Sequence, residues 1–209
     1  MKYIPIIFVL LFFAVAGCVE QSPYKQVSPS QLVSSPGSFE GKQVCINGIM
    51  DNLSISGIFI ETTGNSTINS FSRNSYIESG VFTSACGTYA DSMIKADSVD
   101  AILSITTDKE IYHSNETLKA HVDFNSPDTG KGKIQVAGIR NEFDRALVNE
   151  TREVDVNKGY NGFDFEFTTP SCEECSALKP GVYPVNATAF LGGKTFGAYR
   201  KITLERELK

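Results

Sequence analysis

Histidine and tryptophan are scarce in this 209-residue sequence, which contains two histidines, His113 and His121, and no tryptophan. His113 stands in a predicted turn and His121 on the solvent face of a predicted strand. Two separated histidines disfavour both a zinc site, which needs three or four ligands, and a Ser-His-Asp arrangement. There is also no Gly-x-Ser-x-Gly element, and the "GKGK" at 130–133 lies in a predicted hairpin rather than a phosphate loop. We therefore predict a non-enzymatic protein without a cofactor.

Positive charge is scarce as well. The sequence has 19 lysines and arginines against 24 aspartates and glutamates, a net charge of −5 at pH 7, and no segment forms a basic stripe. Nucleic-acid binding depends on such a stripe to neutralise phosphates. Nucleic acid is therefore not an expected partner, and the acidic side chains are expected to form a solvated surface.

Only one long hydrophobic run is present, from Ile4 to Ala16. As a helix it would be ~20 Å long at ~1.5 Å per residue, which is short of the ~30 Å hydrocarbon core of a bilayer. A basic residue, Lys2, precedes the run and small residues follow it, as is typical of a secretion signal. We predict a cleavable signal peptide over residues 1–17.

The end of this run, Val15-Ala16-Gly17-Cys18, resembles the lipobox of prokaryotic lipoprotein precursors, with valine where leucine is commonest. The resemblance implies cleavage before Cys18 and lipidation of its thiol. The alternative is an ordinary signal peptide with an incidental cysteine. Two acyl chains anchor a protein stably where one is marginal. The mature chain is thus expected on the extracytoplasmic face of the cell membrane, with residues 18–27 as a lipidated polar tether.

Four cysteines follow the leader: Cys45, Cys86, Cys172 and Cys175. An even number in an exported chain indicates disulfides, because exported chains meet oxidising conditions. Three pairings are open, and we predict Cys45–Cys86 and Cys172–Cys175, which keep each bond within one half of the chain. The first would close about 42 residues and stabilise the fold by ~4 kcal/mol on the chain-entropy account.

The "SCEECS" segment also has the Cys-x-x-Cys spacing of thiol–disulfide oxidoreductases, which place the motif at a helix N-terminus to lower the pKa of the attacking thiol. Here Glu173 and Glu174 oppose thiolate formation, and only "SALK" separates Cys175 from Pro180, too little for a helix. A structural disulfide is favoured. An extracytoplasmic oxidoreductase using Cys172 and Cys175 is the alternative function from another class.

Residues 28–103 are expected to form the first domain. Ser28 can cap a short helix that begins at Pro29, and strand-like segments follow it. The opening "SSPGSFEGKQVCING" resembles the short helix and Glu-Gly-Lys turn at the start of small OB-like barrels of exported proteins. The resemblance implies a small β-barrel here.

OB barrels commonly bind oligonucleotides or oligosaccharides on one face. Residues 61–80 contain eleven Ser, Thr or Asn, which predicts a long polar loop or an exposed hairpin. Phe71 and Tyr76 of this segment are candidates for stacking on a sugar. A small-molecule or glycan receptor is therefore a further alternative, beside a barrel that serves only as a spacer.

Residues 104–209 are expected to form the second domain. Apolar and polar residues alternate in "LKAHVDF", "FDFEF" and "YPVNATAF", which predicts antiparallel strands with one buried face. Such strands recur at roughly ten-residue intervals, a spacing typical of β-sandwiches. The inward-facing residues are expected to be Leu118, Ala120, Val122, Phe124, Phe163, Phe165, Phe167, Tyr183, Val185, Ala187 and Ala189.

Within this domain "LKPGVY", with Leu178, Pro180, Gly181 and Tyr183, resembles the tyrosine corner of immunoglobulin-like sandwiches. The resemblance implies that the Tyr183 hydroxyl bonds to backbone a few residues upstream. Without tryptophan, the Cys-Trp-Cys core of antibody domains is absent.

The segment "TDKEIYHSNETLKAHV" resembles the opening of macroglobulin-type domains, with Ser114-Asn115 in place of the usual Pro-Gly. Thioester chemistry is not implied, because the chain lacks a Cys-Gly-x-x-Gln element.

Two further polar patterns concern the surface. Asp155–Asp164 offers oxygen ligands to calcium, but Gly159 and Tyr160 break the EF-hand pattern, so a plain turn is expected. Asn-x-Ser/Thr sequons indicate either surface glycosylation or only a polar surface. They stand at Asn52, Asn65, Asn115, Asn149 and Asn186.

Together these patterns predict an all-β protein: a lipoprotein signal peptide, an OB-like barrel, and an immunoglobulin-like, macroglobulin-type sandwich. The expected function is a non-enzymatic binding or envelope-structural role at the cell surface. Its expected partners are the membrane, through the lipid, and a surface protein or glycan.

Overall fold

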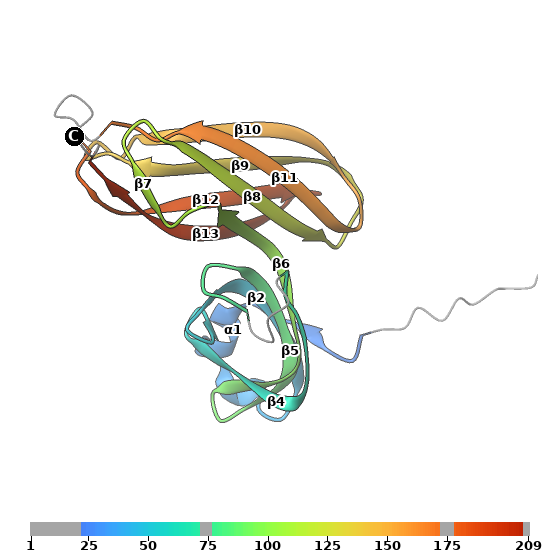
Figure 1. Cartoon of the computed structure of the whole chain (residues 1–209). Coiled ribbons are helices and arrows are strands. Elements are labelled where there is room, and N and C mark those ends of the chain that lie inside the picture. The colour runs from blue at the N-terminus through green and yellow to red at the C-terminus, as the bar shows by residue number, and fades with distance from the viewer. Residues whose placement is uncertain (1–21, 72–76, 172–177, 207–209) are drawn as a thin grey trace, which may run out of the picture.

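The computed structural model describes residues 22–71, 77–171 and 178–206 (Figure 1). These residues form mostly β-strands around two hydrophobic cores that follow one another along the chain, so the mainly β class is confirmed. Cys18 with its leader, Tyr76, Cys172 and Cys175 lie outside the described residues. No helix of the described ranges has the length and apolarity needed to cross a membrane.

The first core is surrounded by the N-terminal part of the chain, in which β2, β3, β4, β5 and the start of β6 belong to one curved sheet and α1 buries Leu32 in the same core (Figure 1). Its elements are β1 (Lys25–Gln26), α1 (Pro29–Ser34), a 3-10 turn (Pro36–Ser38), β2 (Gln43–Asp51), β3 (Ser54–Ile55), β4 (Ile58–Asn69) and β5 (Phe82–Ala90).

The second core lies between two facing sheets of the C-terminal part. Its elements are β6 (Met93–Thr107), β7 (Ile111–His113), β8 (Thr117–Ser126), β9 (Gly130–Arg140), β10 (Ala146–Val156), β11 (Gly159–Thr168), β12 (Gly181–Leu191) and β13 (Lys194–Glu205). One sheet ends in the order β6-β8-β11, and the other has the order β10-β9-β12-β13-β7.

The helix α1 begins where the sequence predicts it. The Ser28 side chain accepts the backbone N–H of Gln31, and the Gln31 side chain accepts the N–H of Ser28, which completes a capping box. Leu32 is the residue that α1 buries in the first core. The predicted helix is confirmed.

The strand β6 belongs to both parts of the molecule. Its first residues pair in parallel with β4 and antiparallel with β5, and from Leu103 onward it pairs antiparallel with β8. One continuous strand therefore links the two cores, and the boundary expected between residues 103 and 104 falls inside it. A hinge at this point would have to disrupt the pairing of β6 with β5 or with β8.

Two sequence expectations differ from the structure. Residues 61–69, expected in a loop or hairpin, belong to β4, because they pair with β6 across a bulge between Thr62 and Thr67. The tether expected over 18–27 does not reach residue 27, because its last residues belong to the folded part. Lys25 and Gln26 pair with β2, and Val27 is buried in the first core.

The predicted alternation of the second part matches the observed faces. Its fully or largely buried members are Leu118, Ala120, Val122, Phe124, Phe165, Val185, Ala187 and Ala189. Phe163, Phe167 and Tyr183 are half-buried and pack against the same core. The intervening residues point outward, so these strands each have one buried face.

Candidate functional site

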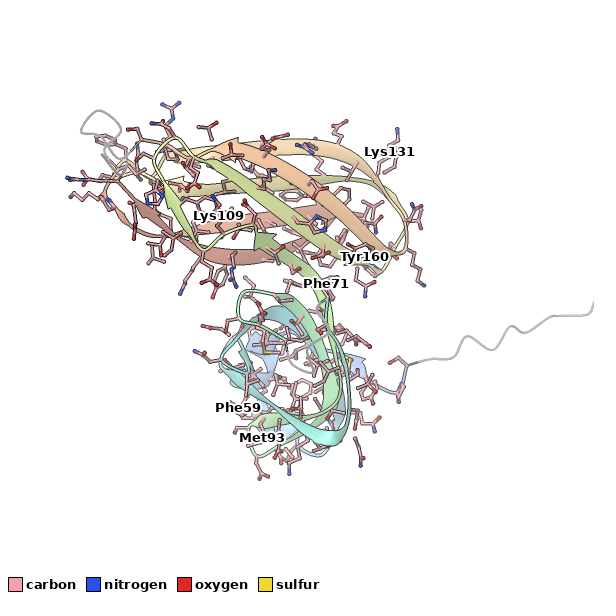
Figure 2. All side chains as sticks on the ribbon, in the orientation of Figure 1. Phe59, Phe71, Met93, Lys109, Lys131 and Tyr160 are labelled. Atoms are coloured by element: carbon pink, nitrogen blue, oxygen red, sulfur yellow. A yellow bond between two sulfur atoms is a disulfide. The ribbon has the colours of Figure 1, made fainter. Side chains whose placement is uncertain are left out.

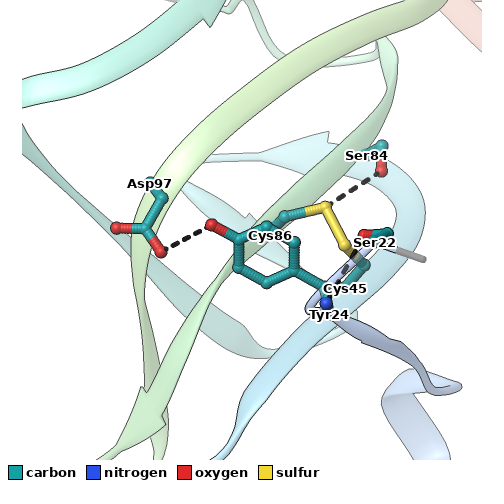
Figure 3. The surroundings of a disulfide bond; sticks show 6 residues. All are labelled: Ser22, Tyr24, Cys45, Ser84, Cys86 and Asp97. Atoms are coloured by element: carbon teal, nitrogen blue, oxygen red, sulfur yellow. Dashed lines mark hydrogen bonds between the residues drawn. A yellow bond between two sulfur atoms is a disulfide. The ribbon is translucent and has the colours of Figure 1, made fainter. Parts of the chain in front are cut away.

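The structure joins Cys45 and Cys86, which are directly opposite each other on β2 and β5 (Figure 3). Cys45 is only 7% exposed, because β1 pairs over it on the outer side of β2. The Tyr24 hydroxyl donates to the Asp97 carboxylate at 2.9 Å beside the bond, which holds the segment before β1 in place. Cys45 is therefore covered, Cys86 is half-buried, and the disulfide has a structural setting.

A buried tyrosine organises the start of the second part. The Tyr112 hydroxyl donates to Asp108 Oδ1 at 2.6 Å and accepts the N–H of Lys109 at 3.0 Å. Asp108 Oδ1 also accepts the N–H of Lys119 at 2.9 Å. Burial, together with the bond to Asp108, raises the pKa of Tyr112 to about 12. The Asp, Lys and Tyr of the "TDKEIY" segment thus tie β6, β7 and β8 together.

Tyr183 makes the hydrogen bond that its motif implies. Its hydroxyl donates to the backbone oxygen of Lys179, four residues upstream. Leu178 of the same motif is buried in the second core. These contacts fix the start of β12, a structural role.

His121 lies between two carboxylates on the outer face of β8. Its Nδ1 is 2.6 Å from Asp164 Oδ1 on β11, and its Nε2 is 3.2 Å from Asp123 Oδ1 on β8. Since ionised carboxylates only accept hydrogen bonds, a ring nitrogen that bonds to either carboxylate does so as the donor. The bond to Asp164, followed by the charge of Asp123, raises the pKa of His121 against the opposing effect of burial.

Asp123 is the hub of this group, which we call the His121 cluster: Ser104, His121, Asp123, Tyr160 and Asp164. The Tyr160 hydroxyl donates to Asp123 Oδ1 at 2.9 Å, and the Ser104 hydroxyl donates to Asp123 Oδ2 at 3.2 Å. The serine is bonded to the carboxylate and not to the imidazole. The cluster therefore lacks the serine-to-histidine hydrogen bond that a nucleophile and its base need.

Stability should depend on pH through His121. A raised folded-state pKa stabilises fully below the unfolded value of about 6.5 and is lost as pH rises through the folded value. We expect His121→Gln to cost about 0.5 kcal/mol near pH 5.5 and about nothing near pH 9, a small effect because the side chain is 38% exposed. Urea unfolding at the two pH values measures it. Asp164→Asn should reduce this pH dependence, and an equal cost of His121→Gln at both pH values contradicts the assignment.

A cavity of about 140 Å³ lies where the two parts of the molecule meet. We call it the junction cavity. Figure 2 places Phe71 and Tyr160 near this junction, on the N-terminal and C-terminal parts respectively. The residues lining it are Ser70, Phe71, Ile77, Glu78, Ser79, Val81, Ala101, Ser104, Ile105, Thr106, Asp123, Tyr199 and Arg200. Two of them, Ser104 and Asp123, also belong to the His121 cluster.

Close backbone contact holds the junction. The N–H of Tyr199 on β13 donates to the Gly80 oxygen at 2.9 Å, and the Gly80 N–H donates to the Met50 oxygen at 2.8 Å. Arg200 adds ion pairs to Glu78 at 3.5 Å and to Glu110 at 2.7 Å. These hydrogen bonds and ion pairs therefore hold lining residues of both the N-terminal and the C-terminal part in place.

The Asp155–Asp164 segment and the sequon asparagines, which the sequence also singled out, lie in turns or on strands. Asn161 stabilises the turn after β10 by donating to the backbone oxygens of Asn157 and Gly159. The described ranges hold no cluster of His, Cys, Asp or Glu suited to a metal. Four sequon asparagines are exposed, at positions Asn52, Asn65, Asn115 and Asn149. Asn186 is half-buried, and its amide donates to the Ala137 oxygen.

His113 ends β7 and lies 3.6 Å from both Glu116 and Glu205. Its ion pairs are with Glu116 and Glu205, and it takes no part in the hydrogen bonds described for the His121 cluster.

No family model and no curated protein sequence matches this chain. Solved structures match about half of it. The sporulation control protein Spo0M from Bacillus subtilis is 15% identical with a TM-score of 0.39, over 51% of this chain and 49% of that one. The alkylpurine DNA glycosylase AlkC from Pseudomonas fluorescens is 12% identical with a TM-score of 0.36, over 51% and 31%.

A β-glucosidase from Listeria innocua is 16% identical with a TM-score of 0.33, over 50% of this chain and 16% of that one. The matched region thus spans about half of the Spo0M chain and less of the other two. At these identities and TM-scores the neighbours do not indicate a function.

Proposed function

We propose that this chain is a lipid-anchored protein of the extracytoplasmic face of the cell membrane, with a non-enzymatic role in binding or envelope structure. In this proposal Cys18 carries the lipid after removal of residues 1–17. The part around the first core is an OB-like barrel, and the part around the second core is an immunoglobulin-like, macroglobulin-type sandwich. The facing sheets and the Tyr183–Lys179 hydrogen bond support the second assignment.

The observation that carries this proposal is the bond between Cys45 and Cys86. Disulfides persist in oxidising compartments and are rare in reducing ones, so this bond agrees with export through the predicted leader. The non-enzymatic role is supported by the His121 cluster, in which both ring nitrogens are engaged by carboxylates.

Lipid anchoring is tested in a prokaryotic host that processes lipoproteins. The wild-type chain should incorporate labelled palmitate and sediment with the membranes. Cys18→Ala should incorporate no label, because the acceptor thiol is gone. An unlabelled wild-type chain in the soluble fraction would count against the proposal, and equal labelling of the variant would place the lipid elsewhere.

The junction cavity favours a second candidate, a small-molecule receptor. Phe71, a candidate for stacking on a sugar, lines this cavity and packs against the first core. In this version the ligand lies between the two parts of the molecule and not on a barrel face alone.

A further inference from the structure

The junction cavity has an apolar side formed by residues of the first core and of β6. Phe71 and Val81 are half-buried, whereas Ala101 and Ile105 are buried. The apolar lining residues are Phe71, Ile77, Val81, Ala101 and Ile105. Such a surface favours a hydrocarbon group over water.

The volume limits what can enter. The cavity measures about 140 Å³. An apolar cavity of about 150 Å³ in another protein takes up one benzene molecule. The apolar group that fits is therefore a single six-membered ring or an aliphatic group of that size.

The polar side of the cavity holds the carboxylates of Asp123 and Glu78 and the guanidinium of Arg200, an excess of one negative charge among its lining residues. Within the described residues Asp123 Oδ2 accepts the Ser104 hydroxyl, and this carboxylate oxygen, on a side chain that is 14% exposed, has room for another donor. Glu78 supplies a second carboxylate and pairs with Arg200 at 3.5 Å. Arg200 is also bonded to Glu110 at 2.7 Å, so its charge is already offset by two carboxylates.

We infer that the junction cavity binds a small amine, in which one ring or short aliphatic group carries one protonated nitrogen. The apolar group packs against Phe71, Val81 and Ile105, and the ammonium donates to Asp123, with Glu78 adding to its attraction. A carboxylate ligand of the same shape is repelled by these two groups. The inference rests on the proposed binding role but does not depend on the lipid anchor.

Three ligands of one shape test this on the purified mature protein: benzylamine, benzyl alcohol and benzoate. Titrations followed by methyl NMR should show benzylamine binding about tenfold tighter than benzyl alcohol, because a hydrogen bond to an ionised group adds about that factor. Benzoate should bind more weakly than either. The shifts should fall on the methyl groups of Ile77, Val81 and Ile105 and spare Ile134 of the second core.

Two variants locate the charge that selects the amine. Asp123→Asn should bring benzylamine close to benzyl alcohol in affinity and leave the alcohol unchanged. Because Asp123 also bonds to His121 and Tyr160, Glu78→Gln serves as the second variant and should lower the preference in part. No methyl shifts with any of the three ligands, or equal binding of benzoate and benzylamine, overturns the inference. These results leave palmitate labelling of Cys18 unaffected, so failure of the amine site and failure of the lipid anchor are separate outcomes.

Discussion

Replacement of both Cys45 and Cys86 by alanine is expected to lower the free energy of unfolding by about 4 kcal/mol, because the bond closes a long loop of the unfolded chain. The two residues are 41 positions apart in the sequence and directly opposite in the β2–β5 register. Alanine is the apt replacement because Cys45 is buried, and a serine hydroxyl there would lack a partner.

Denaturant unfolding of the purified chain measures this cost. Cys172→Ala/Cys175→Ala is the matched control, since it removes the same number of thiols and leaves Cys45 and Cys86 in place. We expect reductant to lower the stability of the Cys172→Ala/Cys175→Ala control as much as the Cys45/Cys86 double replacement lowers that of the wild type. A double variant within about 1 kcal/mol of the wild type would contradict a stabilising role.

The second large effect is expected at Gly80, where Ala should destabilise the junction by about 2–4 kcal/mol. Its backbone has φ +93°, and a Cβ there would lie 2.2 Å from the Tyr199 backbone oxygen. Either the junction opens or the Tyr199-to-Gly80 hydrogen bond breaks. Hydrogen exchange at the Tyr199 amide should therefore speed up in Gly80→Ala, in addition to the loss of global stability.

Two other glycines separate the causes. Gly57 has φ +83° with nothing within 4 Å of an added Cβ, so Gly57→Ala measures backbone strain alone. Gly197 has neither a positive φ nor a close neighbour, so Gly197→Ala should be nearly neutral. If Gly80→Ala costs no more than Gly57→Ala, the close approach of the two parts at Gly80 is not important for stability.

Local patterns in the sequence were enough to predict local structure. Ser28 followed by Pro29 predicts a capped helix start, and the structure has it. The alternation in "LKAHVDF" predicts the faces of β8, because one face meets the core and the other meets solvent. In the first case the interacting residues are neighbours along the chain, and in the second the pattern depends only on which face of the strand is buried.

Pairing between distant segments could not be predicted in the same way. The second half of β4 is mostly exposed, so its Ser, Thr and Asn residues show no alternation and suggest a loop. Its strand geometry comes from parallel pairing with β6. The continuity of β6 through both parts was also missed, because each half of the strand has a different partner.

The candidate site could not be predicted for the same reason, because its residues come from segments far apart in the sequence. His121 was expected on a solvent face, and its side chain is 38% exposed. Its partner Asp164 lies 43 positions away in the sequence and reaches it only through the β8–β11 register. The junction cavity needs both parts of the molecule to be packed, so no single segment could indicate it.

The most direct test is the intact mass of the chain isolated from membranes of cells that process lipoproteins, taken before and after reduction and alkylation. The account predicts a polypeptide that starts at a diacylated Cys18, with Cys45 and Cys86 open to alkylation only after reduction. A chain that keeps residues 1–17, or one whose Cys45 and Cys86 alkylate without reductant, would contradict it.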